Sequence, residues 1–142
     1  MKVPRKPKTI ARLLDDCAVV LQKIVRMKAA VHAKSAYIRC VTCGKVDHWK
    51  SMQGGHYISR TWTALKILEE NIHPLCVSCN CYRPERIADD YHLYMVDTYG
   101  YEFVQELNAT KRTTVKRSRA ALAEELALLK AQAKELEAEV PV

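Results

Sequence analysis

Two closely spaced pairs of cysteines constrain this chain more than any other feature. They read Cys40-Val-Thr-Cys43 and Cys76-Val-Ser-Cys79, with residues 44–75 between them. Two such pairs can present four thiolates to one tetrahedral zinc ion, so these four cysteines are the predicted ligands. An ion held in this way closes a loop that is large enough to carry a functional site.

The six cysteines of the chain favour zinc over disulfides. Four of them fall in the Cys-x-x-Cys pairs, and the basic N-terminal segment lacks the apolar stretch of a secretory signal, so we expect a reducing, cytoplasmic setting. Cys17 lies on an apolar helical face and is expected in the core. Cys81 adjoins the second pair, where it is either a bystander or an alternative ligand.

The chain is basic, and its charge is uneven. Its 23 Lys and Arg outnumber its 16 Asp and Glu, which gives a formal charge of +7. Residues 1–39 contain ten Lys or Arg and two Asp, whereas residues 120–142 contain two Lys and five Glu. The basic excess of residues 1–39 indicates either a polyanion partner, with nucleic acid the leading candidate, or a solvated basic surface. Residues 1–8 predict a basic arm that follows a DNA backbone, and no apolar run in the sequence is long enough to cross a membrane.

Helical periodicity dominates both ends of the chain. Thr9 predicts the N-cap of a helix that runs to about Lys34, and the C-terminal segment predicts a second long helix. The two helices pair either within one chain or between two chains. Their apolar stripes recur at spacings of three and four residues, at Leu13, Cys17, Val20, Ile24, Met27 and Val31 in the first and at Val115, Leu122, Leu126, Leu129, Ala133, Leu136 and Val140 in the second.

The centre of the chain predicts two strands followed by a helix, because apolar alternation and glycine-rich punctuation replace the helical period there. The second cysteine pair is expected to open a helix that carries Asn80. The other expected elements are a short strand at 37–39, a tight turn at Gly54-Gly55, a strand at 56–59 and an extended segment at 71–75.

The fold class is therefore α+β, with a zinc-stapled ββα core between long terminal helices. We expect an arm and helix at 1–36, the core at 37–108 and the last helix at 109–142. Within the core, two further helices are expected, from about Glu85 to Tyr99 and from Tyr101 to Leu107.

Three polar residues inside the zinc loop suggest hydrolytic chemistry. His56 has a side chain that can accept a proton near neutral pH, and Asn80 follows a predicted zinc ligand, which would fix its amide oxygen in front of a hard cation. Asn71 could hold the loop that carries His56. Each residue has an ordinary alternative, as a strand histidine, a helix cap and a turn residue respectively. Their combination within one frame favours a site for phosphodiester hydrolysis.

The ordered motifs resemble the phage lambda NinG/Rap family of recombination endonucleases, which belong to the HNH (ββα-metal) nuclease superfamily. They are also similar to the Ref-type nucleases. The resemblance covers residues 37–108 and is carried by the two cysteine pairs together with Gln53-Gly-Gly-His56-Tyr57, Asn71-Ile-His73-Pro and Asn80.

This resemblance implies roles for individual residues. His56 corresponds to the general base, Asn71 to the residue that orients it, and Asn80 to a ligand of a catalytic Mg²⁺ or Mn²⁺. The four paired cysteines correspond to a structural Zn²⁺ site. The expected products carry 5′-phosphate and 3′-hydroxyl ends.

The chain departs from the usual HNH pattern at one position. Many HNH enzymes have an acidic metal ligand immediately before the base histidine, and this position is Gly55 here. Gln53 is the nearest alternative ligand, and Asp47 is a more distant one. His73 could add a further metal ligand, contact phosphate, or be a buried strand histidine.

The leading hypothesis is a metal-dependent endonuclease that cuts branched DNA, such as a Holliday junction or D-loop, during phage recombination in the cytoplasm of the infected host. Its long terminal helices would suit a homodimer, and a recombination protein is an expected partner. One alternative is a non-catalytic zinc module that binds DNA or a recombination partner. The other is a zinc-stapled assembly protein without affinity for DNA.

Overall fold

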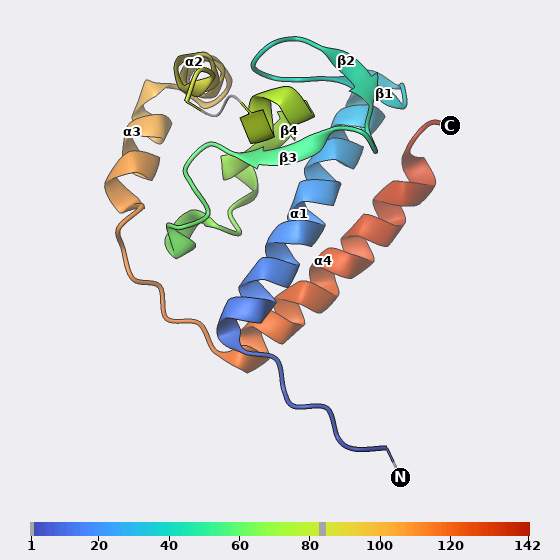
Figure 1. Cartoon of the computed structure of the whole chain (residues 1–142), viewed down its shortest axis with the longest axis vertical. Helices are drawn as coiled ribbons and strands as arrows, with labels where there is room; N and C mark the ends of the chain where they lie inside the picture. The colour runs from blue at the N-terminus through green and yellow to red at the C-terminus, as the bar shows by residue number, and fades with distance from the viewer. Residues whose placement is uncertain (1, 83–84) are drawn as a thin grey trace.

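The computed structural model describes residues 2–82 and 85–142, and in it long helices surround two small sheets (Figure 1). This arrangement confirms the α+β class. The helices are α1 (Ile10–Ala33), α2 (Ala88–Tyr99), α3 (Tyr101–Thr110) and α4 (Arg119–Glu139), with shorter helical turns η1 (Thr63–Leu65), η2 (Glu69–Asn71) and η3 (Ser78–Tyr82). The strands are β1 (Tyr37–Arg39), β2 (Val46–His48), β3 (Gln53–His56) and β4 (Ile72–Leu75).

The first helix begins and ends where the sequence predicts. The Thr9 side chain accepts a hydrogen bond from the Arg12 backbone N–H at 3.1 Å, which satisfies one of the unpaired donors of the first turn. Lys34 takes the left-handed conformation (φ 54°) and donates its N–H to carbonyls of the last turn. The helix carries its apolar stripe inward, with Cys17 and Ile24 fully buried.

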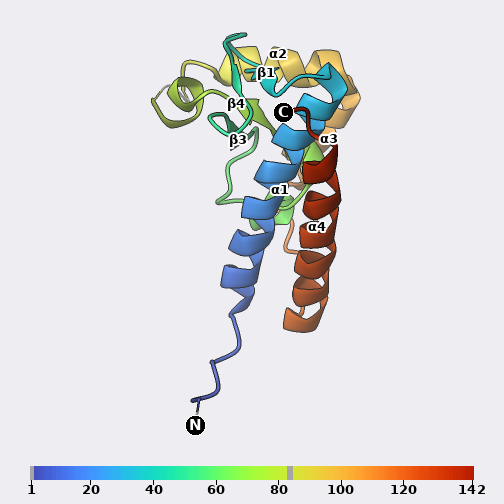
Figure 2. The ribbon, with the colours of Figure 1, turned by 90° about the vertical axis from the view of Figure 1, so that its right-hand side faces the viewer.

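The terminal helices α1 and α4 lie side by side and run in the same direction (Figures 1 and 2). The Cys17 Sγ lies 3.9 Å from the Leu122 carbonyl oxygen, and Lys23 pairs with Glu137 at 3.4 Å. The two helices therefore pair within one chain. The predicted start of the second stripe was wrong, since α4 begins after its Ser118 N-cap and Val115 lies outside the helix, with 46% of its surface exposed.

The central strands form the sheet that carries the candidate site. β3 pairs antiparallel with β4, with His56 opposite Ile72 and Gln53 opposite Leu75. The smaller sheet pairs β1 with β2. Val46–His48, to which the sequence analysis assigned no element, thus supplies the partner of the predicted strand at 37–39.

Two predictions about β3 were wrong. The strand ends at His56 instead of beginning there, because the Asn71 side chain takes both backbone polar groups of Ile58 and prevents the ladder from continuing. Gly54 lies within the strand and not in a turn. A Cβ atom at Gly54 would lie 2.7 Å from the Gln22 Cα, so a glycine there lets the strand backbone rest directly on α1.

The second cysteine pair leads into a helical turn, as predicted, but the turn is short. η3 is a single π-type turn that carries Asn80, and the next helix, α2, begins at Ala88, later than the predicted Glu85. Residues 83–84, which precede the predicted helix, lie outside the described residues, as does Met1 of the predicted basic arm. Among the residues described, none of the helices combines the length and the apolar character needed to span a bilayer.

We expect Leu126→Ala to lower the free energy of unfolding by about 2–5 kcal/mol, because it empties a packed position between α1 and α4. Leu128→Ala, on the same helix but 62% exposed, is the matched control and should change the free energy of unfolding by less than about 0.5 kcal/mol. Denaturant titration followed by circular dichroism measures both. Equal effects would contradict the helix pairing described above.

Candidate functional site

The four paired cysteines meet at one point. Their sulfur atoms all lie within 4.8 Å of one another, and the Sγ atoms of Cys43 and Cys76 are 3.7 Å apart. A tetrahedral zinc ion with Zn–S bonds of about 2.3 Å places its sulfur ligands about 3.8 Å apart. The donor set and its dimensions therefore fit a structural zinc ion. Cys81 is exposed and is not part of the cluster.

Backbone groups around the cysteines support the charged thiolates. Lys45 and Cys79 direct their N–H groups at the sulfurs of Cys43 and Cys76, each at 3.4 Å. Gly44 has φ 79°, a conformation that favours glycine, and its N–H binds the Cys40 carbonyl at 2.9 Å. Such N–H···S contacts stabilise negative charge on sulfur.

A cavity of about 1010 Å³ opens beside the cysteine cluster. Its lining includes residues of α1, β3, η3, α2 and the loop after β3. Four of the predicted site residues line it: Gln53, His56, Asn80 and the predicted zinc ligand Cys79. The tertiary structure therefore brings the predicted base and the predicted metal ligand onto one cavity. Asn71, His73 and Asp47 are not among its lining residues.

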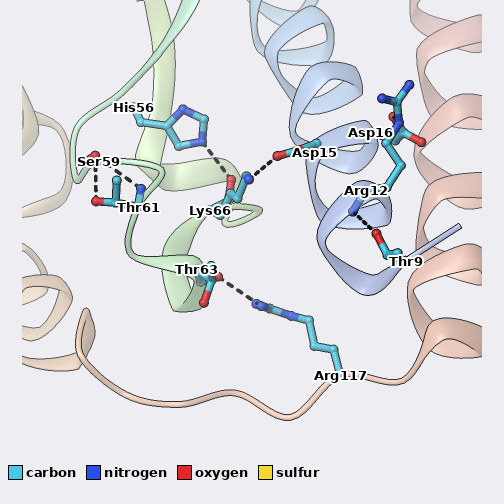
Figure 3. A network of polar contacts seen from close by, with 10 residues as sticks. All are labelled: Thr9, Arg12, Asp15, Asp16, His56, Ser59, Thr61, Thr63, Lys66 and Arg117. Atoms are coloured by element: carbon cyan, nitrogen blue, oxygen red, sulfur yellow. Dashed lines mark hydrogen bonds and ion pairs between the residues drawn. The ribbon is translucent and has the colours of Figure 1, made fainter.

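The His56 ring is held by a backbone carbonyl. Its Nε2 lies 2.8 Å from the Lys66 carbonyl oxygen (Figure 3). A carbonyl only accepts, so Nε2 carries the proton and the lone pair of the neutral ring is on Nδ1. Burial lowers the pKa of His56; the bond to Lys66 opposes this, and the charges of Arg60 and Lys66 add to the lowering. The ring is thus kept neutral, the state that accepts a proton.

The loop that supplies this carbonyl is itself fastened from two sides (Figure 3). The Lys66 ammonium pairs with Asp15 on α1. From the segment before α4, the Arg117 guanidinium donates to the Thr63 carbonyl at 3.0 Å and to the Ala64 carbonyl at 3.4 Å. Sequence reasoning missed this support because a backbone acceptor has no side-chain signature.

Asn71 is fully buried and fastens the same loop. Its Oδ1 accepts from the Ile58 N–H at 2.8 Å, and its Nδ2 donates to the carbonyls of Ile58 and Leu65 at 3.0 and 3.2 Å. These bonds tie the start of the loop that follows His56 to its far end. The side chain lies where it would hold the His56 loop in place.

Gln53 and Asn80 form an amide pair at the cavity wall. The Asn80 Nδ2 donates to the Gln53 Oε1 at 2.7 Å, and the Cys81 thiol also lies 3.2 Å from that oxygen. A Cβ at Gly55 would lie 2.9 Å from the Asn80 Oδ1 and 2.2 Å from the Leu75 Cδ1. The bare Gly55 backbone is therefore what allows the Asn80 side chain to lie against the strand. Amide oxygens of this kind suit a hard divalent cation.

His73 is placed away from the cavity, in a cluster of tyrosines. The Tyr91 hydroxyl donates to the Gly55 carbonyl at 2.7 Å, so His73 Nδ1 donates to Tyr91 (3.1 Å) and His73 Nε2 accepts from Tyr99 (2.8 Å). Both ring nitrogens are thus occupied by hydroxyl groups. Burial lowers the pKa of His73 to about 4. Sequence reasoning placed Tyr91 on an apolar helical face and assigned neither tyrosine a contact with His73, because their spacing along α2 resembles ordinary core packing.

The rim of the cavity is cationic. Arg26, Lys50, Arg60 and Lys111 contribute to its lining, and among the described residues that line it there is no carboxylate. The Lys111 ammonium also lies 5.5 Å from the centre of the Trp62 ring, within the range of cation–π attraction. Such a cavity attracts an anion.

Comparison with known proteins gives the family. The family model described as "Bacteriophage Lambda NinG protein" matches residues 3–139. The chain belongs to the NinG family. It is 32% identical over 107 residues to the protein ninG of Escherichia phage 933W and equally to that of Enterobacteria phage VT2-Sa. These matches cover 66% of this chain and 51% of each relative, so the chain spans about half the length of the curated relatives it matches. No solved structure matches the chain.

We expect the NinG-family chain to bind one zinc ion through its cysteine cluster. Cys40→Ser or Cys76→Ser should abolish zinc binding and unfold the central unit, because the free energy of zinc binding contributes directly to folding in small metal-binding domains. Zinc content by mass spectrometry and thermal melting by circular dichroism measure both effects. Cys81→Ser is the matched control and should keep the zinc and the melting transition. A cooperative transition that survives chelation unchanged would contradict this assignment.

The buried His73 should make stability depend on pH. The His73 ring has the ordinary pKa of 6.5 in the unfolded chain and a pKa of about 4 in the folded protein. The neutral ring therefore contributes its full stabilisation above pH 6.5, and this contribution is lost as the pH falls from 6.5 towards 4. Between about pH 7 and about pH 5 this loss amounts to about 2 kcal/mol. The pH dependence of urea unfolding should therefore be shallower in His73→Gln than in wild type. Release of zinc at low pH affects wild type and His73→Gln alike, so it cancels when the two are compared. Unfolding free energies that depend on pH in the same way in both proteins would refute the prediction.

Proposed function

We propose that this NinG-family chain is a metal-dependent DNA endonuclease of the HNH type. One observation carries the proposal: the His56 imidazole is neutral, has its Nε2 committed to the Lys66 carbonyl, and lines a cationic cavity together with Asn80. A general base needs a free lone pair at a fixed place, and the Nδ1 atom has one. The zinc cluster fixes the backbone next to Asn80.

Each residue has a separate task in the proposed reaction. His56 Nδ1 takes the proton of the attacking water. Asn80 and Gln53 present amide oxygens on which Mg²⁺ or Mn²⁺ would sit, and that ion supplies Lewis-acid stabilisation of the phosphate and leaving oxygen when bound. Asn71 holds the loop that orients His56. Arg26, Lys50, Arg60 and Lys111 attract the phosphodiester backbone.

The choice of branched DNA as substrate rests on the resemblance to the NinG/Rap endonucleases. The chain spans about half of its curated relatives, so substrate and partner belong to this proposal and not to the family assignment. We propose junctions or displaced strands of phage recombination as substrates, in the cytoplasm of the infected host. A homodimer and a recombination protein are the proposed partners.

A second function is favoured by one specific observation. The described lining of the cavity has no carboxylate, and a site without an anionic ligand holds a divalent cation weakly. A zinc module that binds DNA through the same cationic rim but does not cut it would have this composition. The two functions make opposite predictions for cleavage.

The test is cleavage of labelled DNA in Mg²⁺ or Mn²⁺ by wild type and by His56→Ala. We expect wild type to cut, and His56→Ala to cut at least about 100-fold more slowly while binding the DNA with nearly unchanged affinity, because only the proton acceptor is removed. His32→Ala, on the exposed last turn of α1, is the matched control. Since burial lowers the pKa of His56, the acid limb of the wild-type rate profile should fall below pH 6.5.

The substrates should include four-way junctions, flaps, duplex and single strands of the same sequence. Faster cutting of junctions or flaps supports structure selectivity, and equal cutting of all four excludes it. DNA binding without any cutting by wild type would favour the non-catalytic zinc module. Binding that disappears steeply with salt in either case identifies phosphate contacts.

A further inference from the structure

A tryptophan lines the cavity beside His56, and the proposed reaction gives it no task. The chain has two tryptophans, of which Trp49 is buried at 5% exposure. Trp62 is only partly buried: its ring packs against the core and also contributes to the cavity wall. A large aromatic surface at the edge of a cavity is available for stacking against a flat ligand.

Two cations lie next to this ring. The Lys111 ammonium is 5.5 Å and the Arg112 guanidinium carbon 5.6 Å from the centre of the Trp62 ring, both within the range of cation–π attraction. These cations directly follow α3, whereas Trp62 comes from the loop after β3. The fold therefore places an aromatic surface and two positive charges side by side, from segments far apart in the sequence.

The loop that carries the ring is fixed by its backbone. The Trp62 N–H donates to the Ser59 carbonyl at 3.0 Å, and the Trp62 carbonyl accepts from the Leu65 N–H at 3.1 Å. The carbonyl of the next residue, Thr63, is held by Arg117 at 3.0 Å (Figure 3). A ligand that stacks on this ring would thus meet a loop that is already ordered, which lowers the entropic cost of binding.

The wall of the cavity is apolar and aromatic as well as cationic. Leu75, Ile87 and Tyr91 are buried side chains that line it, and the partly buried Tyr57 ring lies 5.3 Å from that of Tyr91. Its volume of about 1010 Å³ is at the upper end of cavities that hold small ligands, about 300–1,000 Å³. One nucleotide needs both surfaces, an apolar one for its base and a positive one for its phosphate.

Double-stranded DNA cannot use both surfaces at once. Its bases are paired and stacked on one another, so its backbone phosphates are what a cationic rim contacts. An unpaired nucleotide presents a free base face together with its phosphate, and aromatic side chains bind such bases by stacking. The cationic rim serves any DNA, whereas the aromatic ring beside it serves a nucleotide that has left the stack.

We propose that Trp62 is the stacking platform for an unpaired nucleotide, with Lys111 and Arg112 holding the adjoining phosphate. The inference rests on the DNA binding of the proposed function and adds the feature of the substrate that the site reads. It requires no bound metal in the cavity. Among the substrates proposed above, it favours displaced strands and flaps over junctions in which every base is paired.

The test uses the fluorescence of the zinc-loaded protein without added Mg²⁺ or Mn²⁺. The probes are oligothymidylate, an abasic deoxyribose-phosphate strand and a blunt duplex, all of the same length. We expect oligothymidylate to quench the tryptophan emission to saturation, and the duplex to leave it nearly unchanged. The abasic strand keeps the phosphates but has no bases, so it should bind at least about fivefold more weakly than oligothymidylate and cause no quenching.

Two substitutions at Trp62 separate stacking from packing. Trp62→Phe keeps an aromatic ring and leaves the buried Trp49 as the single tryptophan, so it should bind oligothymidylate but lose the quenching. Trp62→Leu keeps apolar packing without a ring. It should weaken oligothymidylate binding at least about fivefold and duplex binding less than about twofold, because the phosphate contacts stay in place. Fluorescence anisotropy of labelled DNA measures these affinities.

Tyr101→Ala is the matched control. Tyr101 is an aromatic residue that is 60% exposed at the start of α3, and it is not among the residues that line the cavity. Its replacement should change neither affinity. Circular dichroism melting of each variant establishes that it is folded, and the comparison of the three probes on wild type does not depend on any variant.

Three results would overturn the inference: equal quenching by duplex and oligothymidylate, equal affinity for the thymidylate and abasic strands, or unchanged oligothymidylate affinity in a folded Trp62→Leu protein. Any of them together with DNA cutting by wild type in Mg²⁺ or Mn²⁺ would leave the endonuclease function standing. The expected quenching and affinities without any cutting would instead support the stacking platform and refute the endonuclease.

Discussion

The convergence of four thiolates is the constraint on which the rest of the structure depends. Cys40 and Cys43 follow β1, whereas Cys76 and Cys79 follow β4, so a zinc ion bound to all four would fix two segments that are far apart in the sequence. β4 runs directly into the second pair, and Asn80 follows its last cysteine. The cysteine cluster thereby sets the position of the amide proposed for chemistry.

The N-terminal helix completes this arrangement. The bare backbone at Gly54 lets β3 lie on α1 at Gln22, and the Arg26 guanidinium donates to the carbonyls of Trp49 and Met52, at 3.3 and 3.0 Å, just before β3. About two turns of α1 before Gln22, Asp15 pairs with the Lys66 side chain of the loop that binds the His56 ring. A helix that the sequence assigns to a flank is thus part of the support for the site.

Burial and charge act on His56 and His73 in different ways. Both rings have a lowered pKa because of burial. His73 has both nitrogens occupied by tyrosine hydroxyls, which makes it a structural hydrogen-bonding centre. His56 has one nitrogen held by a carbonyl and no partner for the other among the described residues, and its ring lines a cavity with a cationic rim. The structural His73 and the candidate base His56 therefore differ in how many of their ring nitrogens are hydrogen-bonded. The residue type alone does not reveal this number.

The sequence by itself determined the features that depend on local spacing: the cysteine ligand set, the caps of α1, the apolar faces of the terminal helices and the family resemblance of the core. The sequence also predicted Gln53, His56 and Asn80 as site residues, because they lie in or next to the Gly-Gly-His and Cys-x-x-Cys motifs. Only the tertiary structure decided where β3 ends and which helix α1 packs against. It also showed that the Lys66 carbonyl holds the His56 ring, that Arg117 supports the loop carrying this carbonyl, and that tyrosine hydroxyls bind both nitrogens of His73. These features depend on contacts between segments far apart in the chain and on backbone groups that every residue shares, so side-chain type and periodicity carry no signal for them.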